Sequence, residues 1–460
     1  MTRSDTPSQE LIDEFVGVSH GDLARVKLLL DSHPSLVNSV AVWGETPIQA
    51  AAQTGQRDIV ELLLSAGAPV DICTAAMRGD VDAVAGFLER DPTSAHTTGA
   101  HGLPVIYYPA CNGRVDIAEL LLSHSATVLG GEGVSPPLHG AVAFGQRNMV
   151  EWLLNHGVSV NALDYRHKSA LQAALDRHDV GSAALIRSRG GKALAAGFVE
   201  IESGKAWYES EGEGPVLVLI HAGVAHSGMW DAQFHAFAEH FRTIRYDLRG
   251  FGKSESKSCS FSFRQDLFDL VKALGIERTA LVGLSMGGQV AVDFTLEHPE
   301  LVSAVVPVAA GLSGFHGGQS DVEAELESQI MAADEKKDLA LLNELELRLW
   351  VDGPGQSPER VPFLLRERMR EMNGVALSHT EEIKSRRLDP PAAGRLDEIR
   401  VPALVIVGDL DTTGVIEACA ALAIGITGAR HVVFPGVAHM VNLERPDEFY
   451  RTVDDFLRTH

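Results

Sequence analysis

Residues 279–294 read TALVGLSMGGQVAVDF, and this stretch decides how the second half of the chain folds. Its first six residues are apolar or small and predict a strand that is buried on both faces, while the residues from Met286 onward predict a helix. Ser285 stands at the sharp turn between them. Gly283 and Gly287 flank it because a Cβ at either position would crowd the turn. A serine presented in this way at the carboxyl end of a strand is predicted to be a nucleophile.

The sequence around this turn alternates strand and helix patterns. Further apolar runs typical of strands lie at 198–203, 205–210, 216–221, 241–247, 302–308, 403–409 and 430–436. Such alternation predicts a mostly parallel sheet with helices on both faces. The alternation stops between Leu312 and Arg400, where two stretches, 321–350 and 358–383, are helical by composition and periodicity. We therefore expect a helical insertion at about 312–400.

A serine nucleophile needs a histidine as base and a carboxylate that orients it. His439 follows the last predicted strand and precedes a helix starting near Pro446. Asp409 and Asp411 follow the strand at 403–409. Because the carboxyl ends of parallel strands meet at one edge of a sheet, these residues are expected on the same side as Ser285. Position in the sequence alone does not decide whether Asp409 or Asp411 is the carboxylate that orients the histidine.

The motif GLSMGG (283–288), the turn DLRGFGKS (247–254) and the pair Met229-Trp230 together resemble the α/β-hydrolase family, and in particular its enol-lactonase and esterase-type branch. The resemblance spans about 197–460. It implies a Ser285, Asp411, His439 catalytic triad, with Asp409 in a turn, and a helical cap at about 312–400. It also implies an oxyanion hole formed by the N–H groups of Met286 and of either Gly223 or Val224, with Gly223 favoured.

The resemblance also bears on substrate and reaction. Val224, Trp230, Phe315 and Trp350 are candidates for lining a pocket, with packing of the cap the favoured alternative for Phe315 and Trp350. A serine at the turn excludes family members that require a carboxylate nucleophile, namely dehalogenases and epoxide hydrolases. The expected reaction is hydrolysis of a small carboxylic ester or lactone through an acyl-enzyme, with no metal or organic cofactor. Carbon–carbon bond hydrolysis, peracid formation, or a vestigial hydrolase serving as an interaction scaffold are the alternatives.

The first 190 residues have a different organisation, in which one pattern recurs. A glycine, a few polar residues and a helical apolar stripe return from Gly21, Gly55, Gly79, Gly113 and Gly145, with a weaker copy from His178. The stretches ETPIQAAAQTG (from 45) and SPPLHGAVAFG (from 135) resemble the ankyrin-repeat signature. We expect about six repeats over 8–192, the third truncated, then a linker at 193–197 and a hydrolase domain at 198–460. Such a module would contact a partner protein or roof the active site.

Composition narrows the location and the partners. Lys and Arg number 39 against 62 Asp and Glu, a formal net charge of −23, so nucleic acid and anionic membrane surfaces are not expected as partners. The four cysteines are widely spaced and fit neither a zinc motif nor a disulfide framework. The first ten residues contain no apolar signal region, and no apolar run reaches the length of a membrane span. We therefore expect a cytoplasmic protein with free thiols.

Overall fold

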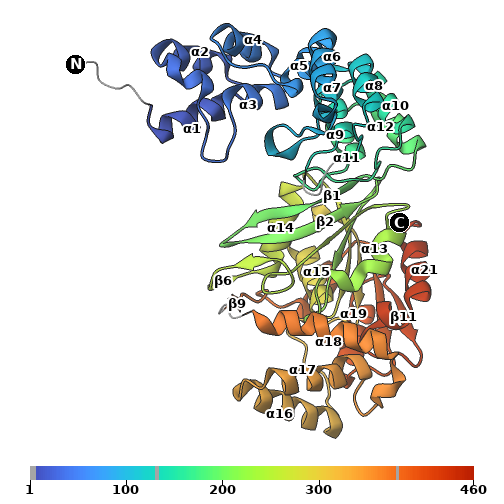
Figure 1. Cartoon of the computed structure of the whole chain (residues 1–460). Helices are drawn as coiled ribbons and strands as arrows, with labels where there is room; N and C mark the ends of the chain where they lie inside the picture. The colour runs from blue at the N-terminus through green and yellow to red at the C-terminus, as the bar shows by residue number, and fades with distance from the viewer. Residues whose placement is uncertain (1–6, 130–133, 380–382) are drawn as a thin grey trace. The chain divides into compact units, whose positions relative to one another are not determined.

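The computed structural model describes residues 7–129, 134–379 and 383–460 (Figure 1). The chain divides into two compact units, Met1–Ala195 and Ala196–His460, here called the repeat unit and the sheet unit. All four cysteines are free thiols, as expected. Within the described residues, no helix combines the length and apolar character that a bilayer crossing requires.

The repeat unit consists of short helices in pairs. Its α-helices are α1 (Gln9–Val18), α2 (Leu23–Ser32), α3 (Pro47–Gln53), α4 (Arg57–Ser65), α5 (Ile72–Arg78), α6 (Val81–Arg90), α7 (Tyr107–Asn112), α8 (Val115–Ser123), α9 (Pro137–Ala143), α10 (Arg147–Asn155), α11 (Ala170–Asp176) and α12 (Val180–Ser188). Short 3-10 turns η1 (Pro34–Asn38), η2 (Pro92–His96) and η3 (Ala100–Gly102) lie between them. The recurring glycines end or separate these helices: Gly79 and Gly113, for example, have φ of 79° and 72°.

The start of α3 shows how the repeat motif specifies a helix. The Thr46 side chain accepts a hydrogen bond from the N–H of Gln49, and the Gln49 side chain accepts one from the N–H of Thr46. Pro47 occupies the first helical turn, where it lacks only an N–H that would have no helical partner. These helices are too short to be stable alone, and their apolar faces are buried against neighbouring repeats in two shared clusters.

The sheet unit is built on one mixed sheet in the order β1-β2-β4-β3-β7-β8-β10-β11, with β5 paired to β2. Its strands are β1 (Leu194–Ile201), β2 (Gly204–Glu211), β3 (Val216–Ile220), β4 (Arg242–Tyr246), β5 (Glu255–Ser256), β7 (Thr279–Leu284), β8 (Val302–Val308), β10 (Leu404–Gly408) and β11 (Arg430–Phe434). From β4 to β11 all neighbours are parallel, while β2 pairs antiparallel with β4 and β5. A separate small sheet pairs β6 (Cys259–Phe261) with β9 (Ile383–Ser385).

The continuous apolar run of β3 is explained by two cores, one on each face of the sheet. Val218 and Ile220 belong to the apolar cluster on one face, whereas Leu217 and Leu219 belong to the cluster on the other. Successive strand residues point to opposite faces, so every position of this strand must be apolar. The covering α-helices are α13 (Asp231–Phe237), α14 (Phe263–Ala273), α15 (Met286–Glu297), α19 (Thr413–Gly425), α20 (Val441–Glu444) and α21 (Pro446–Leu457).

The predicted helical insertion is a group of helices between β8 and β10 that lies beside the sheet in orange tones (Figure 1). It contains α16 (Asp321–Glu335), α17 (Leu339–Leu347), a π-helical turn η6 (Arg348–Asp352) and α18 (Phe363–Ser378). The segment also contains three short 3-10 turns, η7 (Pro358–Arg360), η8 (Ala392–Gly394) and η9 (Leu396–Glu398). Two more 3-10 turns lie elsewhere in the unit, η4 (Ser227–Trp230) and η5 (Pro299–Leu301). Residues 380–382 of the stretch expected to be helical lie outside the described residues.

Two features of the sheet unit differ from expectation. Residues 194–197, expected within a linker, form the first half of β1. Ala and Gly disfavour strands, but pairing with β2 overrides that weak local preference. The short strands β5, β6 and β9 were not expected, because two or three residues carry no readable alternation.

Candidate active site

Ser285 occupies a strained turn between β7 and α15. Its φ and ψ are 58° and −117°, a conformation that non-glycine residues rarely adopt. Its N–H donates to the carbonyl of Val308 at 2.8 Å, which fixes the turn to the neighbouring strand β8. The residue is half-buried. The turn therefore holds a hydroxyl at the edge of the sheet at an energetic cost that tight packing around it must offset.

The glycines around Ser285 are required by the backbone. A Cβ on Gly283 would lie 2.1 Å from the carbonyl oxygen of Gly287, and one on Gly287 would lie 2.3 Å from that of Ile220. At Gly288 the obstacle is the Ala310 side chain, 2.6 Å away. Real Cβ atoms do not approach other atoms so closely. The crowding expected from the sequence is thus present, and it includes contact between the turn and β3.

His439 and Asp411 form a buried pair. Nδ1 of His439 lies 2.8 Å from Oδ2 of Asp411, and both side chains are almost inaccessible to solvent. The other Asp411 oxygen accepts the N–H of Thr412 at 2.7 Å. Because a carboxylate only accepts hydrogen bonds, Nδ1 carries the hydrogen and Nε2 is left with a free lone pair when the ring is neutral. This is the tautomer that a general base at Nε2 requires.

Ser285, Asp411 and His439 follow the carboxyl ends of β7, β10 and β11, which run parallel in the same sheet. The loops after β10 and β11 are packed together, since the N–H of Leu410 donates to the carbonyl of Val437 at 3.0 Å. A Cβ on Gly408 would lie 2.1 Å from that same carbonyl oxygen. The sheet therefore brings residues that are distant in sequence to one edge.

Asp409 has a different position from Asp411. It is exposed, and its carboxylate accepts the N–H of Gly436 at 2.6 Å. It therefore ties the loop after β10 to the loop that leads to His439. This cross-loop hydrogen bond could not be read from the sequence, which suggested only a local turn.

The loop after β3 lies against the start of α15. A Cβ on Gly223 would lie 3.7 to 3.9 Å from side-chain atoms of Met286, so these two residues are neighbours. His221 holds the loop in place: Nδ1 donates to the carbonyl of Ala222 and Nε2 accepts the N–H of Leu248, both at 2.8 Å. Complete burial lowers the pKa of His221 to about 4, so the ring is neutral in this role.

The four predicted pocket residues fall into different environments. Trp350 is half-buried, and its ring centroid lies 4.8 Å from that of His439. Val224 and Phe315 are half-buried and pack on opposite core clusters of the sheet unit. Trp230 has no exposed surface and packs against Phe449 within the core. Trp350 is thus placed beside the proposed base, whereas Trp230 is part of the core.

An ion-pair network holds the turn that carries Trp350. Arg366 of α18 makes hydrogen bonds of 2.9 and 3.0 Å to Asp352, which is fully buried, and also one of 2.9 Å to Glu344 of α17. Burial acts to raise the pKa of Glu344, but hydrogen bonds from Arg366 and from the neighbouring cations Arg370 and Arg348 outweigh it and lower that pKa to about 2. The sequence suggested helices here but not this network, because its members are spread over three elements.

A second contact joins the insertion to the loop of Asp411. Glu323, in the first turn of α16, accepts the N–H of Thr413 at 2.7 Å and its hydroxyl at 3.1 Å. Ser320 caps the same helix and forms a capping box with Glu323. The start of α16 is therefore fixed two residues from the proposed catalytic acid.

The turn 247–254 is structural. The Asp247 carboxylate accepts N–H groups from Ser227 and Lys253, both at 2.8 Å. Arg249 is fully buried and pairs with Asp266 at 2.7 and 2.9 Å. The turn thus shapes the loop after β4, and its arginine is committed to an internal carboxylate.

Comparison with family models gives two matches. Residues 217–452 match the model described as the Alpha/beta hydrolase family, and residues 15–129 and 72–164 match the model for ankyrin repeats in three copies. The first match spans about half of the chain and the second spans most of the repeat unit.

Individual proteins resemble the sheet unit. A pimeloyl-[acyl-carrier protein] methyl ester esterase of Nitrosospira multiformis is 27% identical over 259 residues, which is 55% of this chain and 98% of the relative. A 2-hydroxy-6-oxononadienedioate/2-hydroxy-6-oxononatrienedioate hydrolase of Burkholderia vietnamiensis is 35% identical over 269 residues, 55% of this chain and 90% of the relative. The solved enol-lactonase from Burkholderia xenovorans is 29% identical with a TM-score of 0.47, covering 57% of this chain and 100% of that one.

Proposed function

The chain belongs to the α/β-hydrolase family and carries ankyrin repeats ahead of its hydrolase part, and from this premise we propose that it is a serine hydrolase of small carboxylic esters or lactones. Family membership confirms the predicted fold class and the prediction of a hydrolase. The observation that carries the finer proposal is the combination of Ser285 on its strained turn with the buried His439–Asp411 pair at 2.8 Å.

In the proposed mechanism, Nε2 of His439 removes the proton of Ser285 as Oγ attacks the substrate carbonyl. Asp411 keeps the proton of His439 on Nδ1 and stabilises the imidazolium that forms. The tetrahedral oxyanion accepts N–H groups from Met286 and Gly223, and the N-terminus of α15 adds a favourable dipole. His439 then gives its proton to the leaving group. Water, activated by the same histidine, hydrolyses the acyl-enzyme.

The helical insertion is proposed as the cap over this site. Trp350 beside His439 and Glu323 beside the loop of Asp411 support that role. Residues of the cap would set the size of the acyl or alcohol group. The net charge of −23 and the commitment of Arg249 to Asp266 favour a substrate without strong negative charge.

Hydrolysis of a carbon–carbon bond is the second candidate, because the hydrolase relative of Burkholderia vietnamiensis is 35% identical. The same serine, histidine and aspartate would serve it. A panel of 4-nitrophenyl esters, lactones and vinylogous diketones separates the two candidates. We expect higher kcat/KM on esters or lactones, and turnover confined to the diketones would select the alternative.

A fluorophosphonate probe tests the nucleophile directly. The full-length protein is expected to be labelled once, and Ser285→Ala is expected to abolish labelling and esterase activity. Ser378→Ala, which removes an exposed hydroxyl at the end of α18, is the matched control and should label like the wild type. A folded wild-type protein that does not label would favour a vestigial hydrolase acting as a scaffold. Labelling that survives Ser285→Ala would move the nucleophile elsewhere.

We further propose that the repeat unit contacts a partner protein. Its short helices have their own apolar clusters, separate from those of the sheet unit, which supports an independent module. A fragment without residues 1–192 that folds and keeps its kcat/KM would support recruitment. An altered KM in that fragment would instead support the alternative that the repeats roof the active site.

A further inference from the structure

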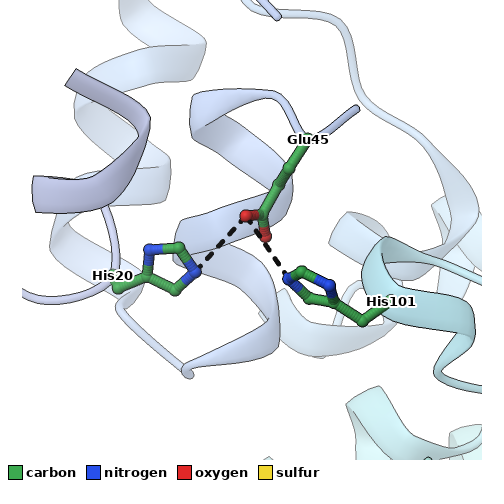
Figure 2. Close-up of side chains that lie close together, drawn as sticks. All are labelled: His20, Glu45 and His101. Carbon is green, nitrogen blue, oxygen red and sulfur yellow. Dashed lines mark ion pairs between the residues drawn. The ribbon is translucent and has the colours of Figure 1, made fainter. Parts of the chain in front are cut away.

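Three side chains with metal-ligating atoms meet in the repeat unit, far from one another in sequence. Nε2 of His20 lies 3.4 Å from Oε2 of Glu45, and Nε2 of His101 lies 3.5 Å from the same oxygen. Both rings face the carboxylate from different segments (Figure 2). One ligating atom from each of the three residues lies within 4.8 Å of the others. No sequence motif indicated this cluster, because its three residues are far apart in the sequence.

The repeat architecture explains the meeting. His20 follows α1, Glu45 precedes the capping residue of α3, and His101 lies in η3, which packs against α3.

The carboxylate of Glu45 is buried and held in orientation. Its side chain is only 2% exposed, Trp43 Nε1 donates to Oε2 at 2.8 Å, and Gln53 Nε2 donates to Oε1 at 2.6 Å. In the described part of the chain, its ion-pair partners are the two imidazoles rather than a lysine or arginine. The neutral donors Trp43 and Gln53 orient the carboxylate without cancelling its charge. Carboxylates that bind metals are commonly oriented by such hydrogen bonds.

His20 is oriented in the same manner. Its Nδ1 lies 3.1 Å from the carbonyl oxygen of Gly17, and since a carbonyl only accepts, Nδ1 carries the hydrogen. Nε2 of the neutral ring therefore carries a lone pair, and it accepts a hydrogen bond from Nε2 of Gln53 at 3.0 Å. Metal-binding histidines characteristically donate their second ring N–H to such a carbonyl.

The distances suit a shared metal ion. Two ligands about 2.0 to 2.1 Å from a tetrahedral zinc ion are separated by about 3.3 to 3.4 Å. The two nitrogen–oxygen separations of 3.4 and 3.5 Å agree with that value and exceed the about 2.7 to 2.9 Å of a charge-assisted hydrogen bond. The His101 ring is half exposed, so small rotations could adjust the remaining separation.

A cavity adjoins the cluster. Its volume is about 510 Å³, and its wall includes His20, Gln53, His101, Tyr107 and Tyr165. Three protein ligands with a fourth position open to a cavity is the arrangement of zinc sites that bind water or a small ligand. Nitrogen and carboxylate ligands in this ratio favour a first-row divalent ion over calcium or magnesium, which prefer oxygen alone.

We propose that His20, Glu45 and His101 bind one divalent transition-metal ion, Zn²⁺ in particular, with an open coordination position directed to the cavity. This site belongs to the repeat unit and is independent of the hydrolase proposed above.

The test uses full-length, untagged protein freed of metal by a chelator. Calorimetric titration with Zn²⁺ is expected to show one tight site per chain, and Co²⁺ should give an intense visible absorption band typical of four-coordinate geometry. Glu45→Gln and His101→Asn should weaken Zn²⁺ binding at least about 100-fold. Asparagine is chosen because His101 has a φ of 53°, which asparagine tolerates.

His96→Asn is the matched control, because His96 is an exposed histidine at the end of η2 in the same unit. It should bind Zn²⁺ like the wild type. Zn²⁺ should also raise the unfolding temperature of the wild type and of His96→Asn but not of Glu45→Gln. A wild type without one tight site and without the cobalt band overturns the proposal, whether or not the variants fold. Equal affinity in a folded His101→Asn variant overturns it as well. Esterase activity does not enter either readout.

Discussion

Each unit brings a buried carboxylate together with imidazole nitrogen, but at different distances. In the sheet unit, His439 and Asp411 lie 2.8 Å apart, which is the length of a hydrogen bond with the proton between them. In the repeat unit, two imidazoles lie 3.4 and 3.5 Å from Glu45, a separation that leaves room for an ion. If both proposals hold, residue type alone does not distinguish the proposed catalytic pair from the proposed metal site.

The two groups of residues also differ in solvent exposure and in the elements that carry them. His439 and Asp411 are both inaccessible and stand on the ends of parallel strands, where the backbone is rigid. His20 and His101 are 34% and 54% exposed and lie between helices. A general base and the carboxylate that orients it need fixed geometry and exclusion of water, whereas a metal site needs access for its ion.

The largest expected effect comes from removing the charge of the catalytic pair. Asp411→Asn should lower kcat about 10⁴-fold, because an amide can donate to Nδ1 and favour the wrong tautomer of His439. Asp409→Asn is the control and should change kcat less than about 10-fold, since the Asp409 carboxylate accepts the N–H of Gly436 and an amide oxygen can accept the same hydrogen bond. Steady-state kinetics on a 4-nitrophenyl ester measure both. Equal losses in the two variants would contradict the assignment of Asp411.

A substitution in the turn at Ser285 should destabilise the sheet unit. Gly287→Ala should lower the free energy of unfolding by at least about 3 kcal/mol, because the new Cβ meets the backbone of β3 at 2.3 Å. Gly394→Ala, where nothing lies within 4 Å, should be close to neutral. Urea denaturation followed by circular dichroism compares them. Similar stability of both variants would mean that the turn is not tightly packed.

The two units should respond oppositely to pH through their histidines. Burial lowers the folded pKa of His221 to about 4 from 6.5. The stabilisation that the neutral His221 ring gives the folded state is therefore complete above pH 6.5 and is lost as pH falls toward 4, which lowers the free energy of unfolding by up to about 3 kcal/mol. In the metal-free protein, attraction to the Glu45 carboxylate raises the pKa of His20, so the stabilisation from this ion pair is complete below pH 6.5 and is lost as pH rises through the raised value.

Denaturation across this pH range in His221→Asn and His20→Gln checks the sign. The stability difference between wild type and His221→Asn should shrink on acidification, and that between metal-free wild type and His20→Gln should shrink as pH rises. Parallel trends in the two variants would refute the opposite linkage.

The smallest effect is expected at the cap. Trp350→Leu should change kcat/KM by about 10-fold, and by different factors for short and long acyl chains, because the Trp350 ring packs beside His439. Leu364→Ala, which truncates an exposed residue of α18, is the control. A uniform loss over all substrates would assign Trp350 to positioning His439 rather than to selecting substrate.

Much of this protein could be predicted from local pattern. The α/β-hydrolase fold was predicted because each central strand is apolar on both faces and the GLSMGG motif demands glycine where a Cβ would meet backbone at 2.1 to 2.3 Å. The ankyrin repeats were predicted because each repeat must present the same apolar stripe to its neighbour. Both signals arise from contacts that recur at fixed sequence spacing.

Features that depend on contacts between distant parts of the chain were visible only in the tertiary structure. It made residues 194–197 part of β1, a strand hydrogen-bonded to β2, placed Trp230 in the core and Trp350 beside His439, and assembled the network around Arg366. It also joined His20, Glu45 and His101 into one cluster. A short motif is readable because its residues act on each other through the local backbone, whereas these groups meet only when separate elements pack.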